Sequence, residues 1–495
     1  MSCITCHWQR IVLAAMLEMF SDLFGVIRAM HQLRPRRVGR REDIQRIQQR
    51  RLRELLTHAR AASPFYRKRL GSLDIERCAT ADLPVLTKRD MMDNFDELVT
   101  DRTIKKRDVE AFVADERNLG RYFLGRYGVC HTSGTQGQPA LIVHDKSALM
   151  LNFTVQFARG AAVQNRKFPH FEHLFEPARL ALITQRPGFY PSGAAFAYLP
   201  AGLEPFFKIL KLSVFDPIGY NVARLNEFRP HYISGYTSFF ETLAREELEG
   251  RLRMRGSALK QIINISEVLP KEIASSLQAA FRVSVTNIYA MGECLALSSG
   301  CTISSGTHIN ADLALLEITD DLGRPVPEGT KGAKVYLTNL YNKVQPIIRY
   351  EIDDIVTLSA QPCACGSPLP LIQSIEGRST DRLWILRDGH YEELPYFVFL
   401  GALHNCLNLA EHQVVQTGLN TFLVKAAPQP GKALTRERLM QLILHSIQLE
   451  HLEDIVRFDI EIVSGIERGP SGKAIRVKNR FGPPPAPPAG QPHHA

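Results

Sequence analysis

The stretch QIINISEVLPKEIASSLQAAFRVSVTNIYAMGE, residues 261–293, decides the fold class. It begins with a β-rich run, residues 261–265, continues with a helical run, residues 271–281, and returns to a β-rich run, residues 284–289. Strands that alternate with helices predict layers built around largely parallel strands. The same alternation extends from about residue 127 to residue 360, so the sequence predicts an α/β fold.

The regions on either side of these residues do not show this alternation of strands and helices. Residues 42–70 predict a helix that stops near Ser63-Pro64, because the residue before a proline avoids the helical region. After about residue 381 the pattern becomes α+β, with a predicted helix over residues 436–449. The Pro-rich tail from Gly482 predicts disorder. The predicted segments are an N-terminal extension (1–41), a large domain (42–380), a small C-terminal domain (381–481) and a disordered tail (482–495).

Composition excludes several classes of protein. The chain has 495 residues, of which 45% are hydrophobic and 22% charged, values typical of a folded protein with two to four domains. The net charge is +9, but residues 34–53 alone hold nine arginines against Glu42 and Asp43. Because the basic charge is local, we expect no nucleic-acid partner. The odd count of nine cysteines favours a reducing compartment, so we expect a cytoplasmic protein.

The N-terminus leaves two interpretations open. Residues 8–30 are apolar except for a narrow polar arc that includes Arg10, Glu18, Asp22 and Arg28. Followed by the arginine run, they predict peripheral contact with an anionic membrane surface. The alternative is a helix that packs on the body of the protein, or an upstream start codon. No uninterrupted run of 18 apolar residues predicts a membrane-spanning helix.

Two motifs suggest nucleotide binding. Thr132-Ser133-Gly134-Thr135-Gln136-Gly137-Gln138-Pro139 is a loop whose backbone N–H groups can face phosphate oxygens, although a surface turn is the alternative. Tyr289-Ala290-Met291-Gly292-Glu293 directly follows a predicted strand, where ligand-binding residues gather in α/β sheets. The aromatic ring could stack on a purine and the carboxylate could hold Mg²⁺; a core tyrosine with a solvated glutamate is the alternative.

Three further motifs follow along the chain. They are Pro346–Asp354, where an aspartate at a strand end can accept from two ribose hydroxyls, Gly377–Asp381, and Gly469–Val477, which flanks Lys473 with glycines. In this order the five motifs resemble those of the adenylate-forming superfamily of acyl-CoA synthetases. Two stretches, RAASPFYR (60–67) leading to LPVLTK (83–88), and IIRY (347–350) leading to CACG (363–366), resemble the phenylacetate–CoA ligase-like branch, which includes coenzyme F390 synthetase-like proteins. The resemblance covers about residues 42–480.

The resemblance implies a large layered α/β domain and a small α+β lid that swings between two half-reactions. In the first, a carboxylic acid reacts with ATP to give an acyl-adenylate and pyrophosphate; in the second, a thiol, usually of coenzyme A, displaces AMP. A carrier-protein thiol or an amine also fits as acceptor.

The resemblance also assigns roles to individual residues. It implies that Lys473 stabilises charge during adenylation, that Glu293 holds Mg²⁺, and that Tyr289 packs on adenine. Asp354 with Arg378 would bind the ribose. The residues implied to cradle the β- and γ-phosphates are Thr132, Ser133, Gly134, Thr135 and Gly137.

Some positions depart from the family pattern. Gln138 replaces a lysine of the phosphate loop and Gln136 replaces a threonine, while Ala290 and Gly292 replace a glycine and a hydroxyl residue before Glu293. Thr380 stands where an acidic hinge residue is common. These departures leave a non-catalytic nucleotide-binding protein as an alternative.

Cysteine spacing predicts a second metal site. Cys301-x6-His308 and Cys363-x-Cys365 supply three thiolates and an imidazole, a tetrahedral set suited to structural zinc. The alternative is four unrelated residues in two loops, with Cys294 equally near in sequence.

Overall fold

The computed structural model divides the chain into two compact units. One unit comprises residues 1–376 with 470–472, and the other comprises residues 377–469 with 473–495. The structure describes residues 24, 25, 27, 33, 40–132, 139–159, 176–184, 188–199, 206–301, 303–304, 306–378, 383–394, 398–399, 403, 406, 408–429, 431–449, 451–468 and 474–481, with the backbone alone at 157, 195, 376–378 and 393. The predicted phosphate-loop residues 133–138, the predicted lysine Lys473 and the predicted tail lie outside the described residues.

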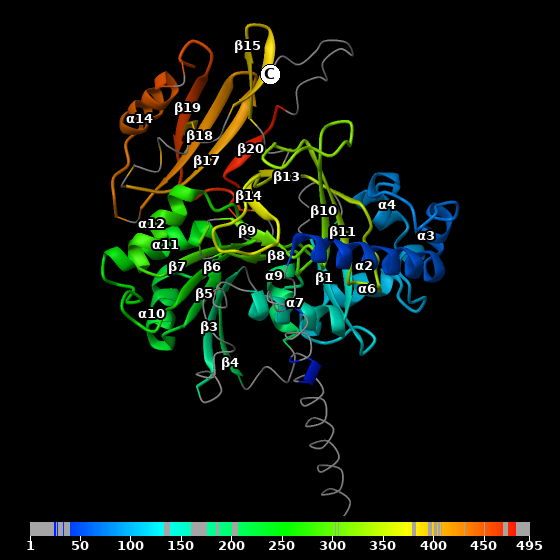
Figure 1. Cartoon of the computed structure of the whole chain (residues 1–495). Coiled ribbons are helices and arrows are strands. Elements are labelled where there is room, and N and C mark those ends of the chain that lie inside the picture. Colours follow the sequence, from blue (N-terminus) through cyan, green and yellow to red (C-terminus); the bar gives the residue numbers. More distant parts are fainter. Residues whose placement is uncertain are drawn as a thin grey trace, which may run out of the picture. The chain divides into compact units, whose positions relative to one another are not determined.

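The first unit contains a five-stranded parallel sheet (Figure 1). Its strands lie in the order β4-β3-β5-β6-β7, and every neighbouring pair is parallel. Apolar side chains of these strands and of the intervening helices form one core, which confirms the predicted α/β class. The bounds are β3 Ala178–Thr184, β4 Phe207–Ser213, α10 Ile218–Phe228, β5 Tyr232–Gly235, α11 Thr237–Leu248, β6 Gln261–Ile265, α12 Lys271–Phe281 and β7 Ser284–Ile288.

Antiparallel strands make up the rest of the sheet structure in this unit. A hairpin, β1–β2, stands by itself, a three-stranded sheet has the order β10-β11-β12, and a four-stranded sheet has the order β13-β14-β9-β8. The bounds are β1 Tyr127–His131, β2 Leu141–Asp145, α7 Lys146–Arg159, α9 Pro191–Ala197, β8 Ser298–Gly300, β9 Thr307–Ile309, β10 Ala314–Thr319, β11 Lys334–Asn339, β12 Tyr350–Ile352, β13 Asp354–Leu358 and β14 Leu371–Arg378.

The predicted helix stops near Ser63-Pro64 as expected, and a second, short helix follows within the expected range 42–70. The first ends at Ala62 and the second begins at Pro64, whose missing N–H costs nothing at the first helical position. Ser63 caps the second helix, because its side chain accepts from the Tyr66 N–H at 3.3 Å. The N-terminal elements are α2 Arg41–Ala62, α3 Pro64–Arg69, η1 Thr80–Asp82, α4 Lys88–Asp93, α5 Phe95–Leu98, α6 Lys106–Ala114 and η2 Glu116–Asn118.

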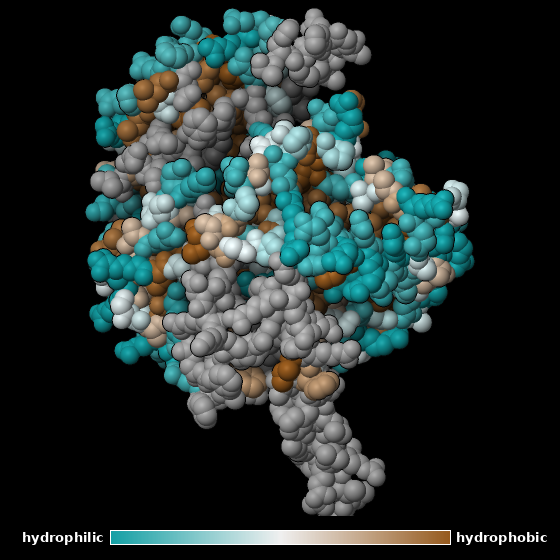
Figure 2. Space-filling model, in the orientation of Figure 1, coloured by the Kyte–Doolittle hydropathy of each residue, from teal (hydrophilic) through white to brown (hydrophobic). Residues whose placement is uncertain are grey.

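Helix α2 carries five arginines of the basic run, and all five have carboxylate partners. The pairs are Arg41–Glu328, Arg46–Asp43, Arg50–Glu54, Arg51–Asp312 and Arg53–Glu76. The surface over this helix is largely hydrophilic (Figure 2). Within the first unit, folding therefore neutralises part of the charge that the sequence presents as one block.

A described part of the N-terminal extension belongs to the first unit. Leu33 is 2% exposed and packs in a small cluster with Val155 and Leu313. The buried Arg159 donates from Nε to the Leu33 carbonyl at 3.1 Å and forms a bidentate pair with Asp312. Each helix in the described part of the chain is too short or too polar to span a membrane.

The second unit is α+β in content. A hairpin, β15 Leu383–Arg387 with β16 His390–Leu394, precedes a four-stranded sheet of order β19-β18-β17-β20. The predicted helix 436–449 is α14 Arg436–Leu449, and its residues Leu439, Ile443 and Ile447 enter the core of this unit. The sheet strands are β17 Leu409–Gly418, β18 Thr421–Pro428, β19 Arg457–Ile462 and β20 Val477–Asn479.

Candidate active site and metal centre

Polar side chains gather where strands β5, β6 and β7 end. Thr237 donates to Asn264 at 2.8 Å, and Asn264 donates to Asn287 at 2.8 Å. Directly after β6, Ser266 adopts a φ of 66°, which places the backbone in the left-handed region. Ligands of open α/β sheets bind beyond the carboxyl ends of the strands. This edge is therefore the candidate active site, and its asparagines were not found from the sequence.

Tyr289 and Asp354 meet at this edge. Tyr289 follows β7 directly, and its hydroxyl donates to Asp354 Oδ2 at 2.7 Å. The Ser298 hydroxyl accepts from the Tyr289 N–H and donates to the Tyr289 carbonyl, both at 2.8 Å, so the backbone that carries the ring is held on two sides. The structure thus brings together the two residues expected to contact adenine and ribose.

Glu293 lies at the corner of a tight turn. Met291 and Cys294 close the turn with reciprocal backbone hydrogen bonds of 3.4 and 3.0 Å. A Cβ on Gly292 would lie 3.2 Å from Pro191 Cγ and 3.4 Å from Cys130 Sγ. A Cβ at position 292 would therefore need Pro191 to shift by a few tenths of an ångström, so the turn is tightly packed around this glycine.

The Glu293 carboxyl group is almost fully buried, at 5% exposed. Burial raises its pKa, whereas hydrogen bonding from Tyr350 and the positive charge of Lys88 favour the ionised form. Asp354 adds a second negative charge nearby, which again raises the pKa of Glu293. The charges of Asp354 and Lys88 therefore both act on Glu293, whose carboxylate supplies oxygen ligands of the kind that a divalent cation prefers.

The LPVLTK connector carries Lys88, whose positive charge lowers the pKa of Glu293. Leu86 donates its N–H to the Arg349 carbonyl and accepts from Glu351, both at 3.0 Å, so the connector joins strand β12 in parallel. The Arg349 guanidinium donates to the Leu83 carbonyl at 2.8 Å. Lys88 then opens helix α4, with Thr87 as its cap. Although the sequence displayed this connector, it gave no sign that the charge of Lys88 would act on Glu293.

Thr132 closes the neck of the predicted phosphate loop. It donates its N–H to the Ala140 carbonyl and accepts from the Ala140 N–H at its hydroxyl, both at 2.9 Å. Residues 133–138 thus connect the two strands of the β1–β2 hairpin. Ser133, Gly134, Thr135 and Gly137 lie outside the described residues, as does Lys473, and Arg378 is described only as the last residue of β14.

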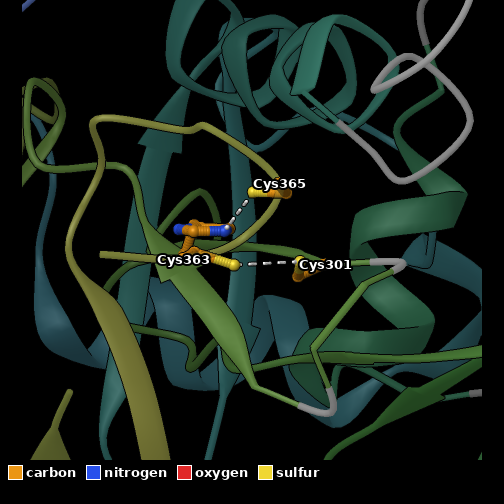
Figure 3. Close-up of side chains that lie close together, drawn as sticks. Cys301, Cys363 and Cys365 are labelled. Atoms are coloured by element: carbon orange, nitrogen blue, oxygen red, sulfur yellow. Dashed lines mark hydrogen bonds between the residues drawn. The ribbon is translucent and has the colours of Figure 1, made fainter. Parts of the chain in front are cut away.

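The four predicted zinc ligands come together in the four-stranded sheet. The ligand atoms of Cys301, His308, Cys363 and Cys365 all lie within 4.8 Å of one another. Cys301 follows β8, His308 lies in β9, and the other two cysteines lie between β13 and β14. Cys301 Sγ is 3.7 Å from Cys363 Sγ, and the two side chains face each other in Figure 3. Zn–S bonds of about 2.3 Å in a tetrahedron require sulfur atoms at about this separation.

The protein orients this cluster in the way that zinc sites require. His308 Nδ1 donates to the Leu369 carbonyl at 3.0 Å, which leaves Nε2 to face Cys365 Sγ at 3.2 Å. Burial alone would raise the pKa of the Cys301 thiol, but hydrogen bonds, led by that of His308, lower its pKa to about 6. A thiolate and an oriented imidazole are the species that bind zinc.

Comparison with known proteins agrees with the geometry. The "AMP-binding enzyme" family model matches residues 46–336. A phenylacetate–coenzyme A ligase of Thermus thermophilus is 26% identical over 356 residues, which cover 70% of this chain and 72% of the relative. Protein CapK of Staphylococcus aureus is 23% identical over 210 residues, covering 42% of this chain and 44% of the relative.

Solved structures show the same fold. A 2-hydroxyisobutyryl-CoA ligase in its postadenylation state aligns with a TM-score of 0.66 at 18% identity, covering 89% of each chain. The same enzyme in its thioesterification state aligns with a TM-score of 0.55. The predicted adenylate-forming fold is thus confirmed. Because the family model spans more than half of the sequence, this chain belongs to the AMP-binding enzyme family.

Proposed function

We propose that this protein is a ligase that activates a carboxylic acid with ATP and passes the acyl group to the thiol of coenzyme A. The observation that carries the proposal is the contact of Tyr289 with Asp354 at one edge of the parallel sheet, with the buried carboxylate of Glu293 in the turn that follows Tyr289. The relationship to a phenylacetate–coenzyme A ligase supports the proposal of both half-reactions.

In the first half-reaction a carboxylate oxygen attacks the α-phosphorus of ATP, and the bond to pyrophosphate breaks. In the second, the sulfur of coenzyme A, having lost its proton, attacks the acyl carbon and AMP departs. Tyr289 and Asp354 bind the nucleoside in this proposal. Lys473 supplies a compact positive charge to the reacting carboxylate and α-phosphate, where charge develops in the transition state.

The buried carboxylate of Glu293 fits a magnesium ion. Burial disfavours an isolated negative charge there, and a cation offsets that cost. The ion would shield the phosphate charges of ATP. Lys88 supplies a positive charge beside Glu293, in a protein whose phosphate loop has Gln138 in place of a lysine.

The test is exchange of labelled pyrophosphate into ATP, with a panel of aryl and fatty acids as substrates. We expect at least one acid to support exchange and Lys473→Ala to abolish it while ATP binding is retained. Lys478→Ala is the matched control, because that lysine pairs with Glu467. Absence of exchange with every acid, or full exchange by the Lys473 variant, would favour the non-catalytic alternative.

The acyl acceptor is tested separately. After adenylate formation, coenzyme A is supplied alone, and thioester formation is followed by mass spectrometry. Thioester formation supports coenzyme A as the acceptor, whereas an adenylate that is consumed only by a carrier-protein thiol or an amine would replace it.

We also propose that Cys301, His308, Cys363 and Cys365 bind a structural zinc ion. Four protein ligands leave no open position, so the site ties β8 and β9 to the segment before β14 and takes no part in the reaction. Metal analysis of the purified protein should give one zinc per chain. A protein that is fully folded and free of zinc would refute the site.

Contact of residues 8–53 with an anionic membrane remains a prediction. Phe24 is 69% exposed and Ile27 is 55% exposed, whereas the five arginines of the basic run in α2 are paired with carboxylates. Liposome flotation of the full chain, compared with a variant carrying Phe24→Ser and Ile27→Ser, tests it; equal recovery of the two proteins would end the idea.

A further inference from the structure

A cluster of buried amides lies at the end of β11 and in the loop that links this strand to β12. Asn339, Asn342 and Gln345 are each 0% exposed, and His144 of strand β2 is 1% exposed. We call these four residues the amide cluster. Buried polar groups are costly unless they are paired, so their partners show what the cluster holds in place.

One side of the cluster holds strand β2. The Gln345 side chain accepts from the Val143 N–H at 2.7 Å and donates to the Leu141 carbonyl at 3.0 Å. Asn342 donates to the Val143 carbonyl at 2.9 Å. Because β2 pairs with β1 on its other edge, the cluster completes the hydrogen bonding of the strand that leaves the predicted phosphate loop.

The other side of the cluster holds the Glu293 turn. The Asn339 side chain donates from Nδ2 to the Glu293 carbonyl at 2.8 Å. Its side-chain oxygen Oδ1 accepts from the backbone N–H groups of Tyr341 and Asn342, which fixes the orientation of the amide. His144 Nε2 is 2.9 Å from the Gly292 carbonyl and therefore donates to it. The Asn342 amide faces His144 Nδ1 at 3.4 Å, which is consistent with this tautomer.

We infer that the amide cluster consists of positioning residues that set the place of the Glu293 carboxylate relative to the phosphate-loop hairpin. The inference rests on the proposed function. Both ends of the cluster bind backbone, and both of the segments they bind carry predicted nucleotide or metal contacts. Displacement of a reacting group by about 1 Å can cost about 10²-fold in rate, so rigid spacing here has a direct chemical consequence.

Two variants test the inference against two matched controls. Asn339→Ala and His144→Leu each remove one hydrogen bond to the turn. Asn221→Ala and His231→Leu remove a buried amide and a buried imidazole that also bond to backbone, but at Ser213 and Arg179.

Each protein is examined for binding of Mn²⁺ in the presence of ATP, by electron paramagnetic resonance, and for the Mg²⁺ dependence of pyrophosphate exchange. Thermal melting is measured in parallel. We expect the two cluster variants to bind Mn²⁺ about 10–100-fold more weakly, the range seen when groups that orient a metal ligand are removed. The half-maximal Mg²⁺ concentration for exchange should rise in parallel, while the controls lose stability but keep both constants.

Cluster variants that behave like the controls would overturn the inference, as would a wild-type protein that binds no Mn²⁺ with ATP. If the wild type binds Mn²⁺ but exchanges pyrophosphate with no acid, the proposed function fails and the binding measurement still decides the inference. Should one cluster variant fail to fold, the other decides the comparison. His144→Gln, which keeps a side-chain N–H, should bind Mn²⁺ as the wild type does.

Discussion

The Glu293 turn and the Cys301–His308–Cys363–Cys365 cluster are both candidate metal sites, but they are built in opposite ways. The turn offers one buried carboxylate, with a tyrosine, a lysine and a second carboxylate around it. The cluster offers four ligand atoms within 4.8 Å of one another and an imidazole already oriented by a backbone carbonyl. One site is incomplete without a substrate, whereas the other is complete by itself.

This difference distinguishes a site that binds a metal ion for the reaction from a site that binds a metal ion to stabilise the fold. A magnesium ion keeps positions for water and for substrate phosphates, so one protein carboxylate is enough. A structural zinc ion has its four positions filled by protein, and its binding energy becomes folding energy. Loss of a ligand should therefore affect activity at the first site and stability at the second.

Glu293→Gln should have the largest effect. Removing the buried charge removes the proposed Mg²⁺ ligand, and we expect pyrophosphate exchange to fall about 10³-fold, a figure in line with the loss of a group that stabilises transition-state charge. The melting temperature should not fall, because burial disfavours the ionised carboxyl group. Glu246→Gln is the control, since that buried carboxylate pairs with Arg251. A variant that exchanges within tenfold of the wild type would remove Glu293 from the site.

Cys363→Ser should show the opposite pattern. We expect zinc to be lost and the free energy of unfolding to fall by about 4 kcal/mol, as expected for loss of a structural metal. Pyrophosphate exchange by the protein that remains folded should show the same Mg²⁺ dependence as exchange by the wild type. Cys78→Ser, a partly exposed thiol away from the cluster, is the control. An unchanged melting curve together with full zinc content would contradict the four-ligand site.

Acid should destabilise the Glu293 region through His144. Burial lowers the pKa of His144 to about 4, below its ordinary value of about 6.5. Above pH 6.5 the residue is neutral in both states and its contribution to stability is complete. As the pH falls towards 4, the unfolded chain takes up a proton that the folded chain does not, so about 3 kcal/mol is lost over this interval. Urea unfolding between pH 7.5 and 4.5 should show a shallower pH slope for His144→Gln; equal slopes would contradict the assignment.

Lys88→Gln should have the smallest effect. Without its charge we expect about a tenfold lower kcat/KM for ATP, equivalent to about 1.4 kcal/mol, because a partly exposed cation is screened by solvent. Arg89→Gln, at the neighbouring exposed position, serves as the control. If both variants match the wild type in exchange kinetics, Lys88 plays no part in nucleotide binding.

The sequence predicted the secondary-structure elements better than the contacts between residues that are distant in sequence. Residues 271–281 and 436–449 form helices with the expected bounds, because their apolar periodicity is local information. The charge of Lys88 acts on Glu293 because the connector that carries Lys88 pairs with a strand distant in sequence, so spacing along the chain could not reveal this interaction. Asn339, which donates to the Glu293 carbonyl, lies in none of the motifs found in the sequence. The cysteine cluster could be predicted because its chemistry restricts the residue types even where the spacing is unusual.

Leu33 shows that the functional chain is longer than its recognisable part. The family model begins at residue 46, yet the Leu33 carbonyl is the acceptor for Nε of the buried Arg159. A shortened protein that starts at residue 42 would leave that guanidinium nitrogen without its acceptor and open a leucine-sized void beside Val155 and Leu313. Such a truncation would weaken the packing where α7 meets Asp312. A protein trimmed to the residues of the family match would therefore be less stable than the full chain, and its activity would not represent that of the full chain.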